Sequence, residues 1–146
     1  MFLEPTAARG SWSRVNPFLP DGPGHGLPGP VAALTRATLR PRHALSFWRR
    51  VPGISARIGA DTDVLFKIGI GEVPFLHQVT FSVWPDSASM ARFARGDGPH
   101  GQAIRAVRAE DWFAEELYAR FHILGAEGRW DGVDPLHPVP LQGEAA

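Results

Sequence analysis

Residues 64–84 decide the fold and read VLFKIGIGEVPFLHQVTFSVW. Two runs in this stretch, Val64–Ile70 and Phe75–Trp84, are rich in the β-branched and aromatic residues that favour strands. The segment Gly71–Pro74 between them begins with glycine and ends with proline, which suits a turn. The stretch therefore predicts two antiparallel strands joined as a hairpin.

The second strand of this hairpin is apolar on both of its sides. Successive residues of a strand face opposite sides, so Phe81 and Val83 point one way and Trp84 points the other. Helices can cover one face of such a sheet, but the second face also needs an apolar neighbour. We therefore expect the open face of the sheet to pack on another sheet.

The elements around the hairpin complete a ferredoxin-like unit. We predict, in chain order, a strand at Val31–Arg40, a helix starting at Pro41, the hairpin strands, a helix opened by Pro85-Asp86-Ser87, a longer helix from Pro99 to about Leu117, and a last strand around Phe121–Ile123. This β-α-β-β-α-β order is that of the ferredoxin-like fold, in the α+β class. Residues 30–125 form the predicted domain. The Gly- and Pro-rich residues 1–29 are expected to be an irregular stub and linker, and residues 126–146 an irregular tail.

A repeated motif flanks this unit. The segments Gly10–Phe18 and Gly128–Leu136 share the pattern G-x-W-x-x-V-[N/D]-P-apolar. The second copy follows the predicted last strand, so by analogy the first copy follows the last strand of an earlier unit, of which only a stub around Phe2-Leu3 is expected here. Two such units packed sheet to sheet would form a dimeric α/β-barrel, with this domain as one half. The alternative is a chance similarity between two loops rich in glycine, tryptophan and proline.

Composition and charge exclude several classes of function. The formal net charge is zero, so no broad positive field favours binding to nucleic acid. The chain has no cysteine, which excludes disulfides, thiolate metal sites and cysteine nucleophiles. No apolar run approaches the length of a transmembrane helix, and the first residues lack the pattern of a signal peptide. We therefore expect a cytoplasmic protein.

Five segments of the chain resemble the spheroidene monooxygenase family, in the family's order. They are Gly29–Arg40, Phe47-Trp48, Gly69–Pro74, Gln78–Trp84 and Arg108–Leu117. The resemblance implies a haem b enzyme that converts C2 of acyclic carotenoids into a ketone, using O₂ and electrons from a ferredoxin-type donor. Family members are longer and carry a further N-terminal unit, so we expect a fragment or a half-length form that rebuilds the barrel as a homodimer. Because carotenoids reside in membranes, a peripheral membrane contact is also expected.

Given this resemblance, His100 is the candidate ligand for the haem iron. It lies in the first turn of the helix predicted to start at Pro99, and imidazole is a common ligand of haem iron. Arg105 and Arg108 flank the same side of that helix and could pair with the haem propionates, while Trp112 offers a flat wall. The alternative is that His100 is a partly exposed first-turn residue without a ligand.

His77 is the second candidate, as a catalytic group on the distal side of the haem. It shares a strand face with Val79 and Phe81, so it could be buried beside the O₂ site. A buried neutral histidine with one backbone partner is the commoner explanation. Trp84, together with Phe81 and Trp48, could line a channel for a polyene, although such residues more often form plain core.

Three functions therefore stay open on the sequence. The first is a haem-dependent carotenoid monooxygenase, and it depends on the family resemblance. The second is a truncated, non-catalytic module that binds haem or dimerises. The third is a cofactor-free barrel monooxygenase, in which the substrate itself activates O₂.

Overall fold

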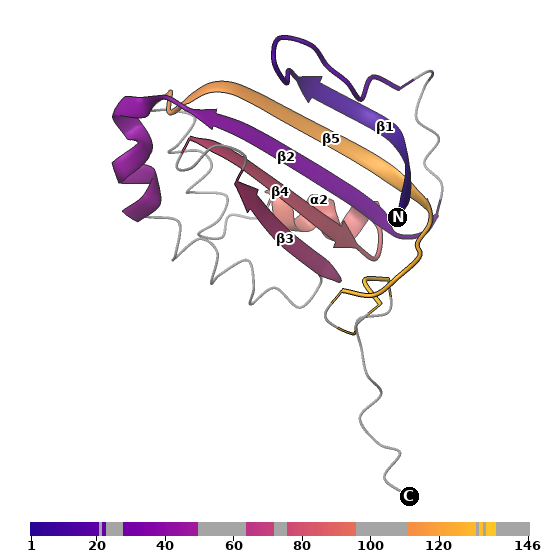
Figure 1. Ribbon diagram of the computed structural model, residues 1–146. Coiled ribbons are helices and arrows are strands. Elements are labelled where there is room, and N and C mark those ends of the chain that lie inside the picture. The colour runs from indigo at the N-terminus through magenta and orange to yellow at the C-terminus, as the bar shows by residue number, and fades with distance from the viewer. Residues whose placement is uncertain are drawn as a thin grey trace, which may run out of the picture.

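The chain forms an antiparallel sheet with a helix on one face (Figure 1). The computed structural model describes residues 1–20, 22, 28–49, 64–71, 76–95, 111–130, 132 and 134–136. The labelled elements are β1 (Phe2–Gly10), β2 (Val31–Leu39), β3 (Phe66–Gly71), β4 (His77–Trp84), α2 (Ser87–Arg95) and β5 (Phe113–Gly125). The strand order is β1-β5-β2-β4-β3, and every neighbouring pair is antiparallel.

The four strands from β2 to β5 confirm the ferredoxin-like unit. Their order, β5-β2-β4-β3, places the first strand of the unit at the centre between its third and last strands. On this central strand, Leu34 lies opposite Phe81 of β4 and Ala119 of β5. The predicted hairpin is also present, with Ile68 of β3 opposite Phe81. The sequence therefore predicted both the hairpin and the topology correctly.

The last strand, β5, begins earlier than we predicted. The long helix expected to reach Leu117 is wrong for residues 113–117, which belong to the strand. Every second residue from Leu117 to Ile123 is buried, and the residues between them are more exposed. This period of two matches a strand and would scatter the apolar side chains around a helix. Residues 99–110 of the predicted helix lie outside the described residues.

The first strand, β1, is also longer than expected. We predicted a short stub at Phe2-Leu3 within an irregular segment 1–29, but β1 is nine residues long and pairs along the outer edge of β5, with Leu3 opposite Ile123. The register shifts just after Pro5, and proline within a run is a poor strand signal. The hydrogen-bonding partner of β1 is more than a hundred residues away in the chain. Local sequence therefore could not reveal the full strand.

The helix α2 covers one side of the sheet, which we call the helix face. The helix starts as predicted, because the Asp86 carboxylate accepts a hydrogen bond from the backbone N–H of Ser89 at 2.7 Å. Met90 is buried, and the ring of Phe93 packs 4.9 Å from that of Trp84. Met90 and Phe93 thus form the apolar side of this helix.

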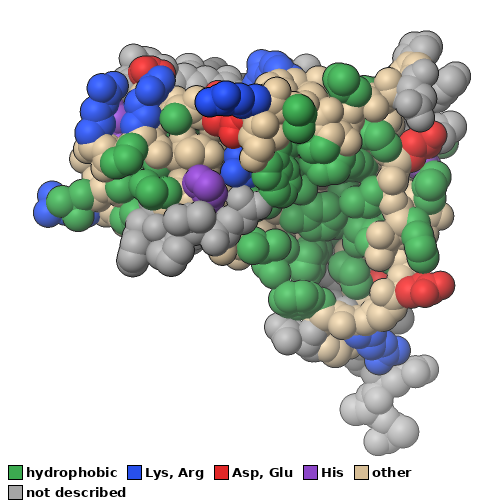
Figure 2. All heavy atoms as spheres, turned by 45° about the horizontal axis from the view of Figure 1, so that its top comes forward, with side chains coloured by type: hydrophobic (Ala, Val, Ile, Leu, Met, Phe, Trp, Pro, Cys, Tyr) green, Lys and Arg blue, Asp and Glu red, His purple; other side chains and the backbone are tan. Residues whose placement is uncertain are grey.

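The opposite side of the sheet, which we call the open face, carries the larger apolar cluster. Its buried members are Ala32, Val83, Ala119, Phe121 and Ile123, and partly buried residues packed against them include Leu3, Phe18, Leu34, Phe66, Phe81 and Leu136. Figure 1 looks onto this side, with α2 behind the sheet, and Figure 2 shows hydrophobic side chains gathered in a hollow there. Packing of this face on another sheet stays a prediction.

The first predicted helix begins where expected. Pro41–His43 form a 3₁₀ turn, and residues 44–49 continue as α-helix, which agrees with the preference for proline at a helix start. Within the described ranges, no helix is both long enough and apolar enough to cross a membrane.

Candidate functional site

A groove of about 490 Å³ lies on the helix face, between α2 and the strands β1, β5 and β2. The residues that line it are Ala7–Arg9, Ala33–Thr35, Ser82, Trp84, Met90, Phe93, Ala94 and Tyr118–Arg120. Its volume falls within the range of small-molecule sites, roughly 300–1,000 Å³. Most of the lining side chains are apolar, so the groove suits an apolar ligand.

The polar groups of this groove are held by their neighbours. The Tyr118 hydroxyl donates a hydrogen bond to Glu116 Oε1 at 3.0 Å, and the Arg9 guanidinium lies over the Tyr118 ring, 4.9 Å from its centroid. The indole N–H of Trp84 donates to Ser82 Oγ at 3.0 Å. These contacts fix the positions of the aromatic side chains that a ligand would meet.

The structure separates the three aromatic residues considered for a polyene channel. Trp84 lines the groove with one part of its ring system and is otherwise buried against α2. Phe81 packs in the cluster on the open face instead. Trp48 is not among the groove residues. Only Trp84 of these three is therefore placed to contact a ligand in the groove.

Trp112, expected as a flat wall for the cofactor, lies just before β5 and is almost fully buried. The His43 ring stacks on it with centroids 5.6 Å apart, and the Phe47 ring meets it edge-on. Its backbone carbonyl accepts a hydrogen bond from the backbone N–H of Arg40 at 2.9 Å. These contacts describe a core residue that holds the first helix against the sheet, and Trp112 does not line the groove.

His77, the predicted catalytic group, opens β4 and is half-buried. Its cross-strand neighbour is Thr38, and it shares the open face with Val79 and Phe81, as predicted from the alternation. The groove lies on the other face of the sheet. The structure therefore does not bring His77 to the groove, and a catalytic role for it stays a prediction.

The predicted iron ligand His100 and its companions Arg105 and Arg108 lie outside the described residues. Within the described parts of the chain, no cluster of His, Asp and Glu side chains could hold a metal ion. A haem iron needs only a single histidine, but none of the groove residues is a histidine. The described lining thus offers apolar walls and the cations Arg9 and Arg120, but no histidine that could hold a haem iron.

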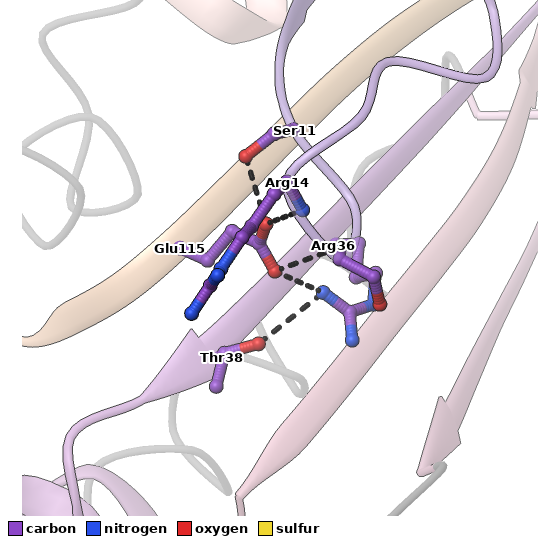
Figure 3. Close-up of polar contacts among 6 residues, drawn as sticks. Ser11, Arg14, Arg36, Thr38 and Glu115 are labelled. Atoms are coloured by element: carbon purple, nitrogen blue, oxygen red, sulfur yellow. Dashed lines mark hydrogen bonds and ion pairs between the residues drawn. The ribbon is translucent and has the colours of Figure 1, made fainter.

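An ion pair between a buried arginine and a partly exposed glutamate lies on the open face (Figure 3). We did not predict this pair from the sequence. The Arg36 guanidinium is 3.1 Å from the Glu115 carboxylate, and the side chain of Arg36 is only 4% exposed. Arg36 also donates to Thr38 Oγ1 at 3.2 Å and lies under the Trp12 ring, 4.8 Å from its centroid. The arginine is therefore compensated on three sides by charge, hydroxyl and aromatic face.

Glu115 also stabilises the loop that follows β1 through hydrogen bonds. Its carboxylate accepts hydrogen bonds from the backbone N–H groups of Arg14 and Ser13, at 2.8 and 3.1 Å, and from the Ser11 hydroxyl at 2.8 Å. These bonds, the Arg14 one foremost, lower the pKa of Glu115 to about 2. Ser13 and Arg14 both have positive φ angles, 54° and 70°, so the carboxylate stabilises a strained turn.

This network was missed because the sequence placed Glu115 on a helix. The helix predicted from Pro99 to about Leu117 includes this residue, whereas the structure places it on β5. One signal was available: Arg36 is the single charged residue in the otherwise uncharged strand β2. A lone arginine at an inward position of a central strand requires a buried partner.

Comparison with known proteins identifies relatives of the chain. No protein-family model matches it. Over its full length, the chain is 58% identical to the spheroidene monooxygenase of Rhodobacter capsulatus, and it covers 61% of that protein. The chain is therefore similar in sequence to the spheroidene monooxygenases. The spheroidene monooxygenase of Cereibacter sphaeroides is 58% identical over 93% of the chain and 42% of its own length. That of Rubrivivax gelatinosus is 42% identical over 88% of the chain and 48% of its own length.

The chain thus spans between 42% and 61% of the length of these spheroidene monooxygenases. Among solved structures, a Fusobacterium nucleatum protein provisionally described as a monooxygenase superposes with a TM-score of 0.59 at 14% identity, over 84% of this chain and 51% of its own. A mutant of SnoaB, a cofactor-independent oxygenase from Streptomyces nogalater, gives 0.51 at 18% identity, over 66% of this chain and 95% of its own. At such identities these likenesses show the fold alone.

Proposed function

We propose that this chain is part of an oxygenase that introduces a C2 keto group into acyclic carotenoids, the activity that its resemblance to the spheroidene monooxygenase family implies. The observation that carries the proposal is the 58% identity over the full length of the chain. The apolar groove on the helix face supports it, because a polyene is a long apolar ligand with no charge to pair. Since such substrates reside in the membrane, a peripheral membrane contact belongs to the proposal.

In the proposed reaction, one oxygen atom of O₂ enters a C2–H bond and the other atom leaves as water. Two electrons from a ferredoxin-type donor and two protons balance each step. A second oxygenation at the same carbon gives a hydrate, which loses water to form the ketone. The groove residues would orient the chain end: Trp84 and Phe93 offer flat apolar surfaces, and Tyr118 a positioned hydroxyl.

Haem b is the proposed cofactor, and His100 is the residue that would hold its iron. Arg105 and Arg108, which lie outside the described residues, are the proposed partners of its propionates, while the described groove, which offers no histidine, is proposed for the substrate. When bound, haem would supply the activation of O₂. The remaining chemistry of the site, which is to hold the substrate end and exclude water, falls to the apolar walls of the groove.

A haem spectrum tests this assignment. We expect the purified chain, supplied with haem, to show a stoichiometric Soret band that is lost in His100→Ala and kept in His122→Ala. His122 is the matched control, because it is a half-buried histidine of β5 outside the groove lining. A Soret band that survives in His100→Ala would refute the ligand assignment. No haem in the wild-type chain would favour the cofactor-free or the non-catalytic alternative.

Filling the groove should weaken carotenoid binding. Ala94 is an exposed residue of α2 that lines the groove, so Ala94→Trp places a large ring in it at little cost in folding. We expect at least a tenfold rise in the dissociation constant for spheroidene, on the order of 1.4 kcal/mol or more, measured in detergent by quenching of tryptophan emission. Ala88→Trp, an equally exposed site of α2 outside the groove, should bind as the wild type does. Equal affinity of both variants would place the substrate elsewhere.

A further inference from the structure

The two copies of the repeated motif share a left-handed backbone at two matching positions. Gly10 and Gly128, which begin the two copies, both have φ angles of 90°. Arg14 and Gly132, four residues further on in each copy, have φ angles of 70° and 80°. Two loops that resembled each other by chance in sequence would not share left-handed residues at the same positions.

The side chains repeat as well. In the first copy the backbone N–H of Phe18 donates to Asn16 Oδ1 at 3.0 Å, and in the second the N–H of Leu136 donates to Asp134 Oδ1 at 2.9 Å. Both Phe18 and Leu136 then pack against the cluster of the open face. The motif is therefore a structural repeat, and the similarity of the two segments is more than a shared composition.

The two copies differ in their contacts with the rest of the chain. In the first copy, Trp12 stacks over the Arg36 guanidinium, and the Glu115 carboxylate accepts hydrogen bonds from the backbone N–H groups of Ser13 and Arg14. In the second copy Trp130 is 53% exposed. Its ring meets the edge of Phe66, with centroids 5.9 Å apart. Among the described residues, the second copy is therefore anchored through Leu136 at its end, while Trp130 stays largely exposed to solvent.

The β1–β5 pair relates the two copies by an approximate two-fold rotation. The strands are antiparallel, and each leads into one copy of the motif. A rotation that exchanges the paired residues Glu4 and His122 would also exchange Gly10 and Gly128, which stand six residues after them in the chain. The same rotation would place the equivalents of Arg36 and Glu115 beside Trp130. These equivalents would belong to a second unit that has β1 as its last strand.

We propose that residues 128–136 dock on a second ferredoxin-like unit that continues the sheet beyond the free edge of β1. This unit would carry an arginine on its central strand and a glutamate on its last strand, at the positions of Arg36 and Glu115. Trp130 stacks on that arginine as Trp12 stacks on Arg36. When the continued sheet curls into a barrel, the strands of the second unit also cover the open apolar face, which is hollowed in Figure 2.

A separate unit fits better than a second copy of this chain. In a second copy, Arg36 and Glu115 already hold residues 11–14, and β1 already covers β5. A homodimer would have to release both contacts in each copy. The R. capsulatus relative offers a source of the partner, because the two-fifths of it that this chain does not match is about as long as the stretch from β2 to β5.

The test uses the chain together with that unmatched part of the R. capsulatus protein, co-produced as a separate polypeptide. We expect the two to co-purify, and Trp130→Ala to raise their dissociation constant at least tenfold, because a desolvated tryptophan is a typical interface hot spot. The melting temperature of the chain alone should hardly change in Trp130→Ala. Trp12→Ala is the matched control: it should lower that melting temperature and leave the dissociation constant within about threefold.

Three outcomes would overturn the proposal. The first is a failure of the two polypeptides to associate. The second is an equal effect of Trp12→Ala and Trp130→Ala on their affinity. The third is a dimer of the chain alone, seen by light scattering, that Trp130→Ala dissociates, since the occupant would then be a second copy. None of these measurements involves carotenoid or haem, so their results stand apart from the proposed function.

Discussion

Gly10→Ala is expected to detach β1 from β5 and to give the largest loss of stability among the substitutions considered. A Cβ atom at Gly10 would lie 2.0 Å from the backbone carbonyl oxygen of Glu116, far inside van der Waals contact. The obstacle is backbone, so no side chain can rotate away. The φ angle of 90° adds the strain of a conformation that side chains disfavour. We expect a loss of more than about 3 kcal/mol in the free energy of unfolding, measured by urea denaturation.

Gly128→Ala is the matched control for this prediction. Gly128 has the same φ angle of 90° in the second copy of the motif, but a Cβ atom there would meet nothing within 4 Å. It should therefore cost only the backbone strain, about 1–2 kcal/mol. The difference between the two variants measures the close approach of β1 to β5. Equal losses would mean that β1 does not lie against β5 as described.

Glu115→Ala is expected to give the second large loss, of about 3 kcal/mol, because it leaves the Arg36 charge buried without its carboxylate. The same change removes the acceptor of the Ser13 and Arg14 N–H groups, so the loop after β1 should loosen. Hydrogen exchange of these two amides would report the loosening directly. Urea denaturation gives the overall loss.

Glu116→Ala is the matched control for Glu115→Ala, because it also removes a carboxylate from β5 but on the other face of the strand. Glu116 lies on the opposite face of the same strand and accepts a hydrogen bond from Tyr118. Its loss should cost no more than about 1 kcal/mol. If both variants lose the same stability, the ion pair with Arg36 is not what stabilises this end of the sheet.

The contribution of Glu115 should depend on pH with a definite sign. Its pKa in the folded chain is about 2, against an ordinary value of 4.5, foremost because it accepts the N–H of Arg14. The folded state therefore favours the ionised form, and its stabilisation is complete above about pH 4.5. As the pH falls from there toward 2, the advantage of the wild-type chain over Glu115→Gln should shrink. Urea denaturation of both at pH 7 and pH 3 checks this, and an unchanged advantage at pH 3 contradicts it.

Much of the fold was predictable because its signals are local. The hairpin of β3 and β4 follows from two β-rich runs around a short turn, and the start of α2 follows from the cap at Asp86. The end of the predicted long helix was wrong because Glu115–Leu117 suits a helix by composition. The sheet decided otherwise, since it buries alternate residues of β5 against β2.

The candidate site was less predictable for the same reason. Trp84 and Phe93 could be placed on strand and helix from the sequence, but the groove between them exists only when α2 folds back over the sheet. The Arg36–Glu115 pair joins residues far apart in the chain, and it forms only because β2 and β5 are neighbours. A contact of this kind leaves no periodic pattern in either strand.

By itself the sequence determined the hairpin, the ferredoxin-like order of elements, the repeated motif and the resemblance to the spheroidene monooxygenases. These depend on residue types and spacings that act within one strand, helix or turn. Only the tertiary structure decided that the N-terminal residues form β1 against β5, and that one tryptophan of the repeat is seated while the other stays exposed. Such facts depend on which strands become neighbours, because pairing between distant segments is set by the packing of the whole sheet.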